Sequence, residues 1–154
     1  MKTDRGLLLC ILSLAHSSIH AQTAGSLAEV HRVYLAITSK PALEYVARML
    51  TRDLEKSGGI QVVRRPAQAD AILAADGDIY VKGYVSLNPR SGNLPGHGEP
   101  VRTGYLSVEL KGKDNETLWS FVATPRFGST NIEHEMSRQV TRELVSAMRG
   151  AGKH

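Results

Sequence analysis

Cysteine is almost missing from this chain of 154 residues, since Cys10 is the only one. It lies inside an apolar stretch and follows Leu9, whereas an acylated lipoprotein cysteine follows a small residue, so we do not expect lipidation. If the first residues are removed as a leader, the remaining chain has no cysteine. Disulfides, thiolate chemistry and cysteine metal sites are then excluded, and the fold must be stabilised by its core.

Long apolar runs, aromatic residues and blocks of like charge are also scarce. No apolar run reaches the roughly 18–20 residues that a membrane-spanning helix needs. Aromatic residues make up 5% of the chain, and the net charge of +4 is spread along it. A nucleic-acid-binding protein usually carries a concentrated basic stretch. The sequence therefore predicts no nucleic-acid partner and no transmembrane span in the mature chain.

The amino terminus has the parts of a cleavable signal peptide in order. Lys2 and Arg5 supply the positive start, residues 7–15 form the apolar centre, and cleavage is expected after Ala21, with Ala24 as the alternative. We therefore expect a periplasmic or secreted protein. The chain divides into a signal peptide at 1–21, a tether at 22–29, a single α+β domain at 30–149 and a frayed tail at 150–154.

Apolar residues recur at helical spacing in two segments, and each segment has start and stop signals. The first begins at Pro41 and ends before Gly58, because proline suits a first turn and glycine ends helices. The second runs from about Asn131 to Arg149. Alternating patterns typical of strands cover residues 30–38, 60–63, 71–86, 104–111 and 117–125.

The pattern predicts three finer features of the strands and of the segment between them. The 71–86 strand should be interrupted by a bulge or hairpin near Asp76-Gly77-Asp78. The proline- and glycine-rich segment 87–102 should be a long loop. The strand at 117–125 is apolar on both faces, so it should be central or covered. The predicted fold class is α+β, with a mostly antiparallel sheet of about five strands and two amphipathic helices on one face.

Common catalytic motifs each fail at a definite place. His134 begins the zinc-protease helix pattern, but Arg138 occupies the position of the second histidine, and a guanidinium cannot ligate zinc. The sequence has no nucleophile elbow and no phosphate-binding glycine loop. An uncharted hydrolase that uses Asp76 or Asp78 with His97 is the enzymatic alternative. The favoured interpretation is a protein without catalytic residues, cofactor or metal.

Two groups of residues are candidates for binding. The first is Tyr80, Tyr84 and Tyr105, which we expect on the sheet face opposite the helices, where they would suit a protein partner. This group favours an envelope accessory protein that binds another protein through its open sheet face or long loop. The second group favours a periplasmic carrier of a small anionic or apolar ligand, and comprises Lys82, Arg90, His97 and Arg102.

Three short segments and the final amphipathic helix resemble a known set of envelope proteins. These segments are Ala69-Asp70-Ala71-Ile72-Leu73, Tyr105-Leu106-Ser107-Val108-Glu109-Leu110 and Glu116-Thr117-Leu118-Trp119-Ser120. They resemble the TolB amino-terminal domain and the curli-assembly CsgG-like and LpoB-like lipoproteins. The resemblance implies an α+β periplasmic domain that works by binding other envelope components. The chain departs from the lipoproteins because it lacks a lipid-attachment cysteine.

Overall fold

A computed structural model describes residues 26–85, 98–126 and 129–152. The predicted signal peptide, both candidate cleavage sites and most of the 87–102 segment lie outside these residues. The described elements are η1 (Leu27–Glu29), β1 (Arg32–Ile37), α1 (Pro41–Lys56), β2 (Gln61–Val63), η2 (Pro66–Gln68), β3 (Ala71–Val85), β4 (Glu99–Lys111), β5 (Thr117–Ala123) and α2 (Ile132–Ala151). None of the helices in these ranges is both long and apolar enough to cross a bilayer.

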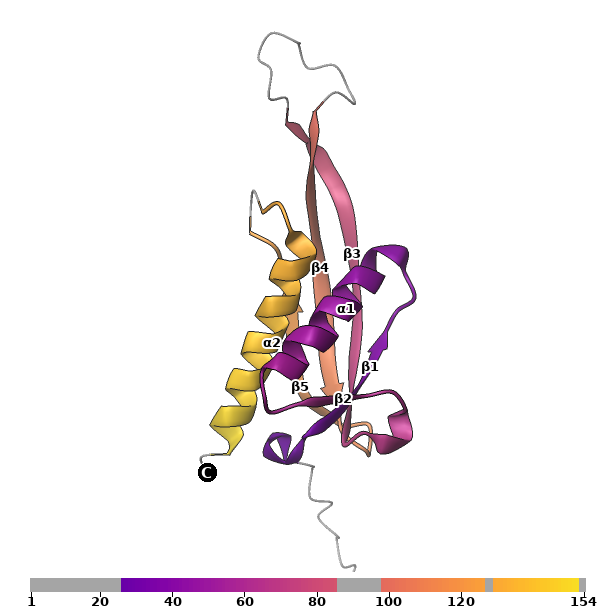
Figure 1. The fold of residues 1–154 in the computed structure, drawn as a ribbon, viewed down its shortest axis with the longest axis vertical. Coiled ribbons are helices and arrows are strands. Elements are labelled where there is room, and N and C mark those ends of the chain that lie inside the picture. Colours follow the sequence, from indigo (N-terminus) through magenta and orange to yellow (C-terminus); the bar gives the residue numbers. More distant parts are fainter. Residues whose placement is uncertain (1–25, 86–97, 127–128, 153–154) are drawn as a thin grey trace, which may run out of the picture.

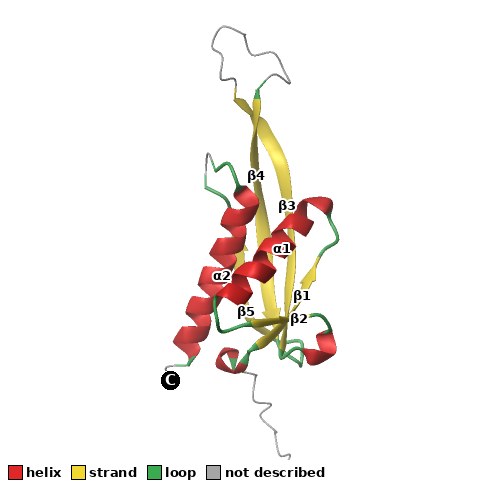
Figure 2. Ribbon diagram, viewed as in Figure 1, coloured by secondary structure: helices red, strands yellow, loops and turns green. Residues whose placement is uncertain are grey.

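The five strands form one mixed sheet in the order β2-β1-β3-β4-β5. β1 pairs in parallel with β2 and β3, while β4 pairs antiparallel with β3 and β5. The antiparallel ladders are the longer ones, so the sheet is mostly antiparallel. Both helices pack on one face of the sheet, which we call the helix face, and the opposite face is the open face (Figure 1, Figure 2). The predicted fold class is confirmed.

The core lies between the helices and the helix face, and it follows the predicted stripes. Side chains at three- and four-residue spacing on each helix are buried against alternate residues of the central strands. The buried positions include Leu43, Val46, Leu50 and Leu54 of α1, Met136, Val140 and Leu144 of α2, and Val33, Leu73, Leu106, Val108 and Leu110 of the sheet. Ser137, a buried polar residue, donates a 2.9 Å hydrogen bond to Asp53 between the two helices.

Of three expectations about the strands, two are wrong and one is confirmed in part. β3 runs without interruption through Asp76-Gly77-Asp78, because each of these residues pairs with β4. β4 already begins at Glu99, so the last residues of the expected 87–102 loop belong to a strand. The third expectation is a central or covered strand: β5 is at the edge of the sheet, but α2 covers one of its faces. Its apolar Trp119 and Phe121 lie on the helix face and stack with ring centroids 5.9 Å apart.

Two element boundaries also differ from the sequence-based ones. Leu27–Glu29, at the end of the predicted tether, form the short helix η1, and Leu27 packs against the core. α2 extends beyond Arg149 to Ala151. Its N-cap is Asn131, whose side chain accepts a hydrogen bond from the backbone N–H of His134.

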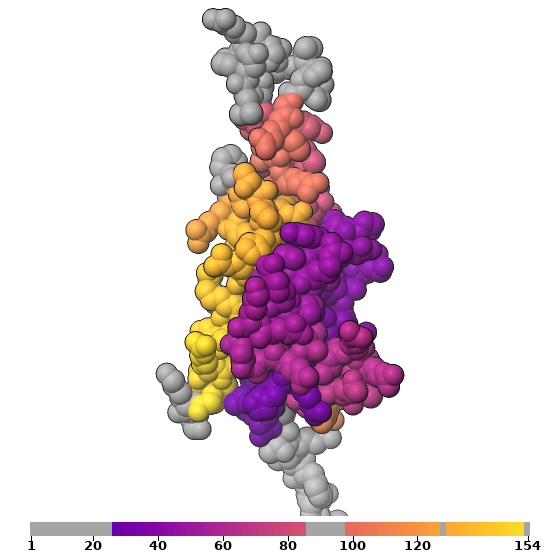
Figure 3. Space-filling model, in the orientation of Figure 1, coloured from indigo at the N-terminus to yellow at the C-terminus, as the bar shows by residue number. Residues whose placement is uncertain are grey.

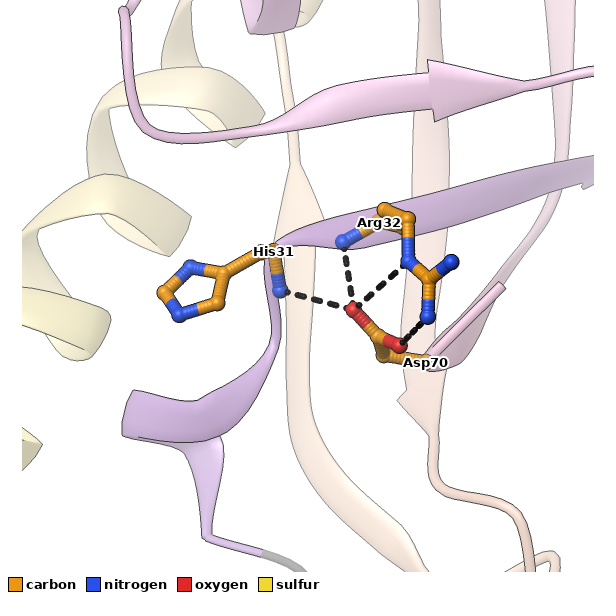
Figure 4. A network of polar contacts seen from close by, with 3 residues as sticks. All are labelled: His31, Arg32 and Asp70. Atoms are coloured by element: carbon orange, nitrogen blue, oxygen red, sulfur yellow. Dashed lines mark hydrogen bonds and ion pairs between the residues drawn. The ribbon is translucent and has the colours of Figure 1, made fainter. Parts of the chain in front are cut away.

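One carboxylate fastens the beginning of β1 to the beginning of β3 (Figure 4). Asp70 Oδ2 accepts the backbone N–H groups of His31 at 3.2 Å and Arg32 at 2.9 Å. Asp70 Oδ1 accepts the guanidinium of Arg32 at 2.7 Å. In return, the backbone N–H of Asp70 donates to the carbonyl of Arg32 at 2.8 Å. These donors, above all the Arg32 guanidinium, lower the pKa of Asp70 to about 2.

Replacing Asp70 with asparagine should destabilise the fold and weaken its acid sensitivity. The folded pKa is lowered from 3.8 to about 2, so the stabilisation by Asp70 is complete above pH 3.8 and is lost as the pH falls through 2. We expect Asp70→Asn to lower the free energy of unfolding by about 1–2 kcal/mol at neutral pH, a figure kept small because solvent screens the ion pair. Thermal melts from neutral to acidic pH measure both effects.

The matched control is Asp114→Asn, which changes an exposed carboxylate in the turn between β4 and β5. It should alter the free energy of unfolding by less than about 0.5 kcal/mol. The expectation fails if the two variants melt alike, or if Asp70→Asn is destabilised equally at every pH.

Candidate functional site

β3 and β4 extend far past their neighbours and form a two-stranded arm. β1 pairs with β3 only as far as Ala75, and β5 pairs with β4 only from Leu106 onward. We call residues 78–85 and 99–105 the arm, because they pair only with each other. At about 3.3 Å per residue the arm is roughly 25 Å long. It projects beyond both helices (Figure 2).

Two glycines allow the arm to begin where it does. Gly77 lies opposite Leu106, and Gly104 lies opposite Ile79. A Cβ atom at Gly77 would collide with the backbone carbonyl oxygen of Tyr105, and one at Gly104 would collide with the backbone oxygen of Asp78. The two strands therefore approach each other more closely here than side chains would permit.

A bulge further along the arm reverses which side chains share a face. The ladder register shifts between Val81, which pairs with Arg102, and Gly83, which pairs with Val101, so Lys82 is the extra residue. Residues directly opposite each other share a face of the ladder. One extra residue on β3 therefore places every later β3 side chain on the face opposite to the one that simple alternation predicts.

The bulge separates the three tyrosines that the sequence placed together. Tyr105 is opposite Asp78, and Tyr80 is opposite Thr103, so both tyrosines lie on the open face. Tyr84 pairs with Pro100 and falls on the face that continues the helix face. The expectation of one row of three tyrosines is therefore wrong, although each of them is exposed.

Most of the exposed large apolar side chains of the described residues are on this arm. Tyr80 and Tyr105 are 53% and 44% exposed on one face. Val81 and Tyr84 are 43% and 56% exposed on the other, and Val85 is 51% exposed. The sequence analysis did not single out either valine. The pattern could have pointed to them, because a strand with apolar residues on both faces needs cover on both faces. No described element supplies that cover.

The base of the arm is held on both edges by charged side chains. On the β3 edge, Lys40 Nζ lies 3.0 Å from Asp76 Oδ1 and donates to the carbonyl of Gly77 at 2.9 Å. The bond with Lys40 lowers the pKa of Asp76, and that with Asp76 raises the pKa of Lys40. On the β4 side, Arg102 lies 3.1 Å from Glu133 of α2. Sequence reasoning missed Lys40 because its partners are 36 and 37 residues away.

The predicted ligand-binding group lies only partly within the described residues, so it stays a prediction. Arg90 and His97 lie outside them, and Arg102 is paired with Glu133. Lys82 is the exposed extra residue of the bulge. In the described ranges no three histidine, aspartate or glutamate side chains come close enough to hold a metal ion.

The alternative of a hydrolase also stays a prediction. Asp76 and Asp78 lie on the same face of β3, since they pair with Ser107 and Tyr105, two residues apart on β4. Asp76 is engaged by Lys40, and Asp78 Oδ1 accepts the backbone N–H of Ile79 at 2.9 Å. His97, the third member of the proposed set, lies outside the described residues.

Alanine at either glycine of the arm's base should destabilise the protein. Gly77→Ala or Gly104→Ala would press a methyl group against a facing backbone carbonyl, which cannot swing aside as a side chain can. We expect a cost of about 1–3 kcal/mol for each, measured by urea denaturation. The control is Gly83→Ala, on the same strand, where a Cβ atom meets open space. Equal urea midpoints for all three variants would contradict this account of the base.

Comparisons with known proteins give a likeness of fold and no family. No protein-family description and no curated protein matches the sequence. A minor lipoprotein from Acinetobacter baumannii is similar in structure, with a TM-score of 0.45 and 15% identity over 77% of this chain and 94% of that one. An uncharacterized lipoprotein B from Nitrosomonas europaea has a TM-score of 0.46 and 17% identity, over 83% and 91% of the two chains.

A third solved structure, the PelC dodecamer from Paraburkholderia phytofirmans, has a TM-score of 0.42 and 20% identity over 77% of this chain and 85% of that one. Neither a family nor a residue role follows from likenesses at these scores. The resemblance to the TolB amino-terminal domain and the CsgG-like and LpoB-like lipoproteins stays a prediction. Two of the three similar chains are named lipoproteins.

Proposed function

We propose that this protein is an exported, non-catalytic accessory protein of the cell envelope that binds another protein through the β3–β4 arm. The exposed apolar arm is the observation that carries the proposal. Five of the seven large apolar side chains that are exposed in the described residues lie on it. Such a concentration is typical of interaction surfaces, whereas isolated exposed apolar residues are ordinary.

The energetics of a two-stranded ribbon support the same proposal. A hairpin that is paired with no third strand and covered by no helix is at best marginally stable in water. Both edges of the arm also present unpaired backbone groups, which are suited to pairing with another chain. A partner that covers the tyrosines and valines would bury apolar area and stabilise the arm at once.

The chemistry of the side chains favours a protein as the partner. Tyr80, Tyr84 and Tyr105 combine a large apolar ring with a polar hydroxyl, and tyrosine is enriched where proteins bind one another. The carrier of a small ligand is less favoured, because the described members of that group, Lys82 and Arg102, are both exposed on the surface. The arm offers an open surface along its length instead of an enclosed cavity.

Tyrosine substitutions on one face of the arm should reduce partner capture. We expect Tyr80→Ser with Tyr105→Ser to lower the yield of the crosslinked complex at least about tenfold, since buried interface tyrosines often contribute 1–2 kcal/mol each. The measurement is in-cell crosslinking of a tagged copy, followed by purification and identification of what is attached. Val81→Ser with Tyr84→Ser tests the other face in the same way.

The control is Tyr45→Ser, which removes a tyrosine that is 39% exposed on α1 and does not belong to the arm. It should leave capture unchanged. Full capture by both double variants would refute the proposal. Recovery of the unsubstituted protein alone and monomeric would also count against it.

A further inference from the structure

We infer that the outer surface of the two helices is a docking surface for an anionic lipid bilayer. Its centre is a row of cations that we call the basic seam: Arg52 and Lys56 of α1, and Arg138, Arg142 and Arg149 of α2. This surface is distinct from the arm, and the inference does not depend on the proposed function. Figure 3 shows α1 and α2 side by side on this face of the molecule.

Folding gathers these cations although they are scattered in the sequence. Arg52 and Lys56 are one helical turn apart on α1, and Arg138 and Arg142 are one turn apart on α2. All four line the same shallow depression between the helices. An adjoining depression shares Arg142 with the first and adds Arg149. The seam is therefore continuous across both helices.

Few acids line the seam itself, although Glu135, which lies 3.6 Å from Arg126, lines a neighbouring depression with Arg138 and Arg142. Asp53 is the only acidic residue that lines the two depressions. Its carboxylate is already engaged, by Arg52 at 3.3 Å and by the hydroxyl of Ser137 at 2.9 Å. Arg142 pairs with Glu143 at 3.0 Å on the surface. Screened, exposed pairs of this kind contribute little, and they exchange readily for another anion.

Three of the seam's cations have no ion pair with any described residue, namely Lys56, Arg138 and Arg149. All three are exposed. They can therefore meet phosphate groups without first losing a partner. Arginine is well suited to this contact, because its planar guanidinium forms two parallel hydrogen bonds with a phosphate.

The dimensions of the seam favour a plane of phosphates over a single one. Arg138 and Arg149 are eleven positions apart on α2, which is about 16 Å along the helix axis. One phosphate cannot reach both ends, whereas the headgroups of a bilayer meet all of the cations together. The depressions are shallow and open, so they suit a surface that stays hydrated more than a ligand that must be enclosed.

The lining of the seam also favours a bilayer over an acidic protein. Specific protein interfaces are centred on buried aromatic or apolar anchors. None of the exposed large apolar side chains of the described residues lines the seam. Its surface consists mainly of arginine, lysine, serine and threonine. Each cation close to an anionic membrane contributes a similar binding free energy, and this electrostatic attraction weakens as the salt concentration rises.

Vesicle co-sedimentation of the purified protein tests the inference. We expect binding to vesicles of phosphatidylglycerol and phosphatidylcholine, little binding to pure phosphatidylcholine, and release as the ionic strength rises. Arg138→Gln with Arg149→Gln should weaken binding roughly thirtyfold, because each cation near the surface contributes comparably. Glutamine keeps the helix propensity, so circular dichroism should show an unchanged fold.

The matched control is Arg64→Gln with Arg65→Gln, which removes the same charge from two exposed arginines between β2 and η2. It should keep most of the vesicle binding, which separates the seam from the net charge of the chain. Equal loss in both double variants would overturn the inference, as would equal binding to both kinds of vesicle. Seam-dependent binding to polyglutamate without binding to vesicles would also overturn it, in favour of an acidic protein. Vesicle binding that survives the arm substitutions would show that the two surfaces act separately.

Discussion

The pairing of β3 with β4 organises this molecule, because β1 pairs with β3, β5 pairs with β4, and only the short strand β2 is added farther out, on β1. Their lower halves carry β1 and β5 on either side, and the helices cover that part of the sheet. Their upper halves carry no further strand. The close approach at Gly77 and Gly104 lies at the boundary between the two halves. A single ladder thus serves as the centre of a stable domain and as the scaffold of an exposed binding element.

An exposed strand edge can pair with other chains and cause aggregation. At the base of the arm, side chains occupy some of the backbone groups that such pairing would use. Lys40 donates a hydrogen bond to the carbonyl of Gly77, and Asp78 accepts one from the backbone N–H of Ile79. These contacts satisfy backbone groups that a foreign strand would otherwise use, as charged side chains commonly do at sheet edges. Toward the tip, Val81, Tyr84 and Val85 are exposed. The protection is therefore concentrated at the base, and the apolar surface lies farther out.

The sequence was informative where the structure is locally determined. The stripes on α1 and α2 and the alternation of Leu106, Val108 and Leu110 follow from helical and strand periodicity, and the core confirms them. The Asp76-Gly77-Asp78 sequence predicted a bulge or hairpin. The structure has a continuous strand there, because these residues pair with a strand about thirty residues away. The bulge at Lys82 could not be predicted, since a one-residue register shift leaves little trace in composition yet moves Tyr84 to the other face. The basic seam was missed for a similar reason, because it is formed by the packing of two distant helices.

The division of the ladder also has a consequence for how such a protein can diversify. Beyond Ile79 on one strand and Leu106 on the other, no residue of the arm belongs to the hydrophobic core. Apart from Gly104, whose lack of a side chain the close approach of the strands requires, residues there can be replaced without disturbing the packing of the two helices on the sheet, so such substitutions carry little penalty for folding. Selection can therefore rewrite the partner specificity of the arm while the body of the domain stays the same. A lineage of such proteins would be expected to keep its fold long after the sequences of its arms have ceased to resemble one another.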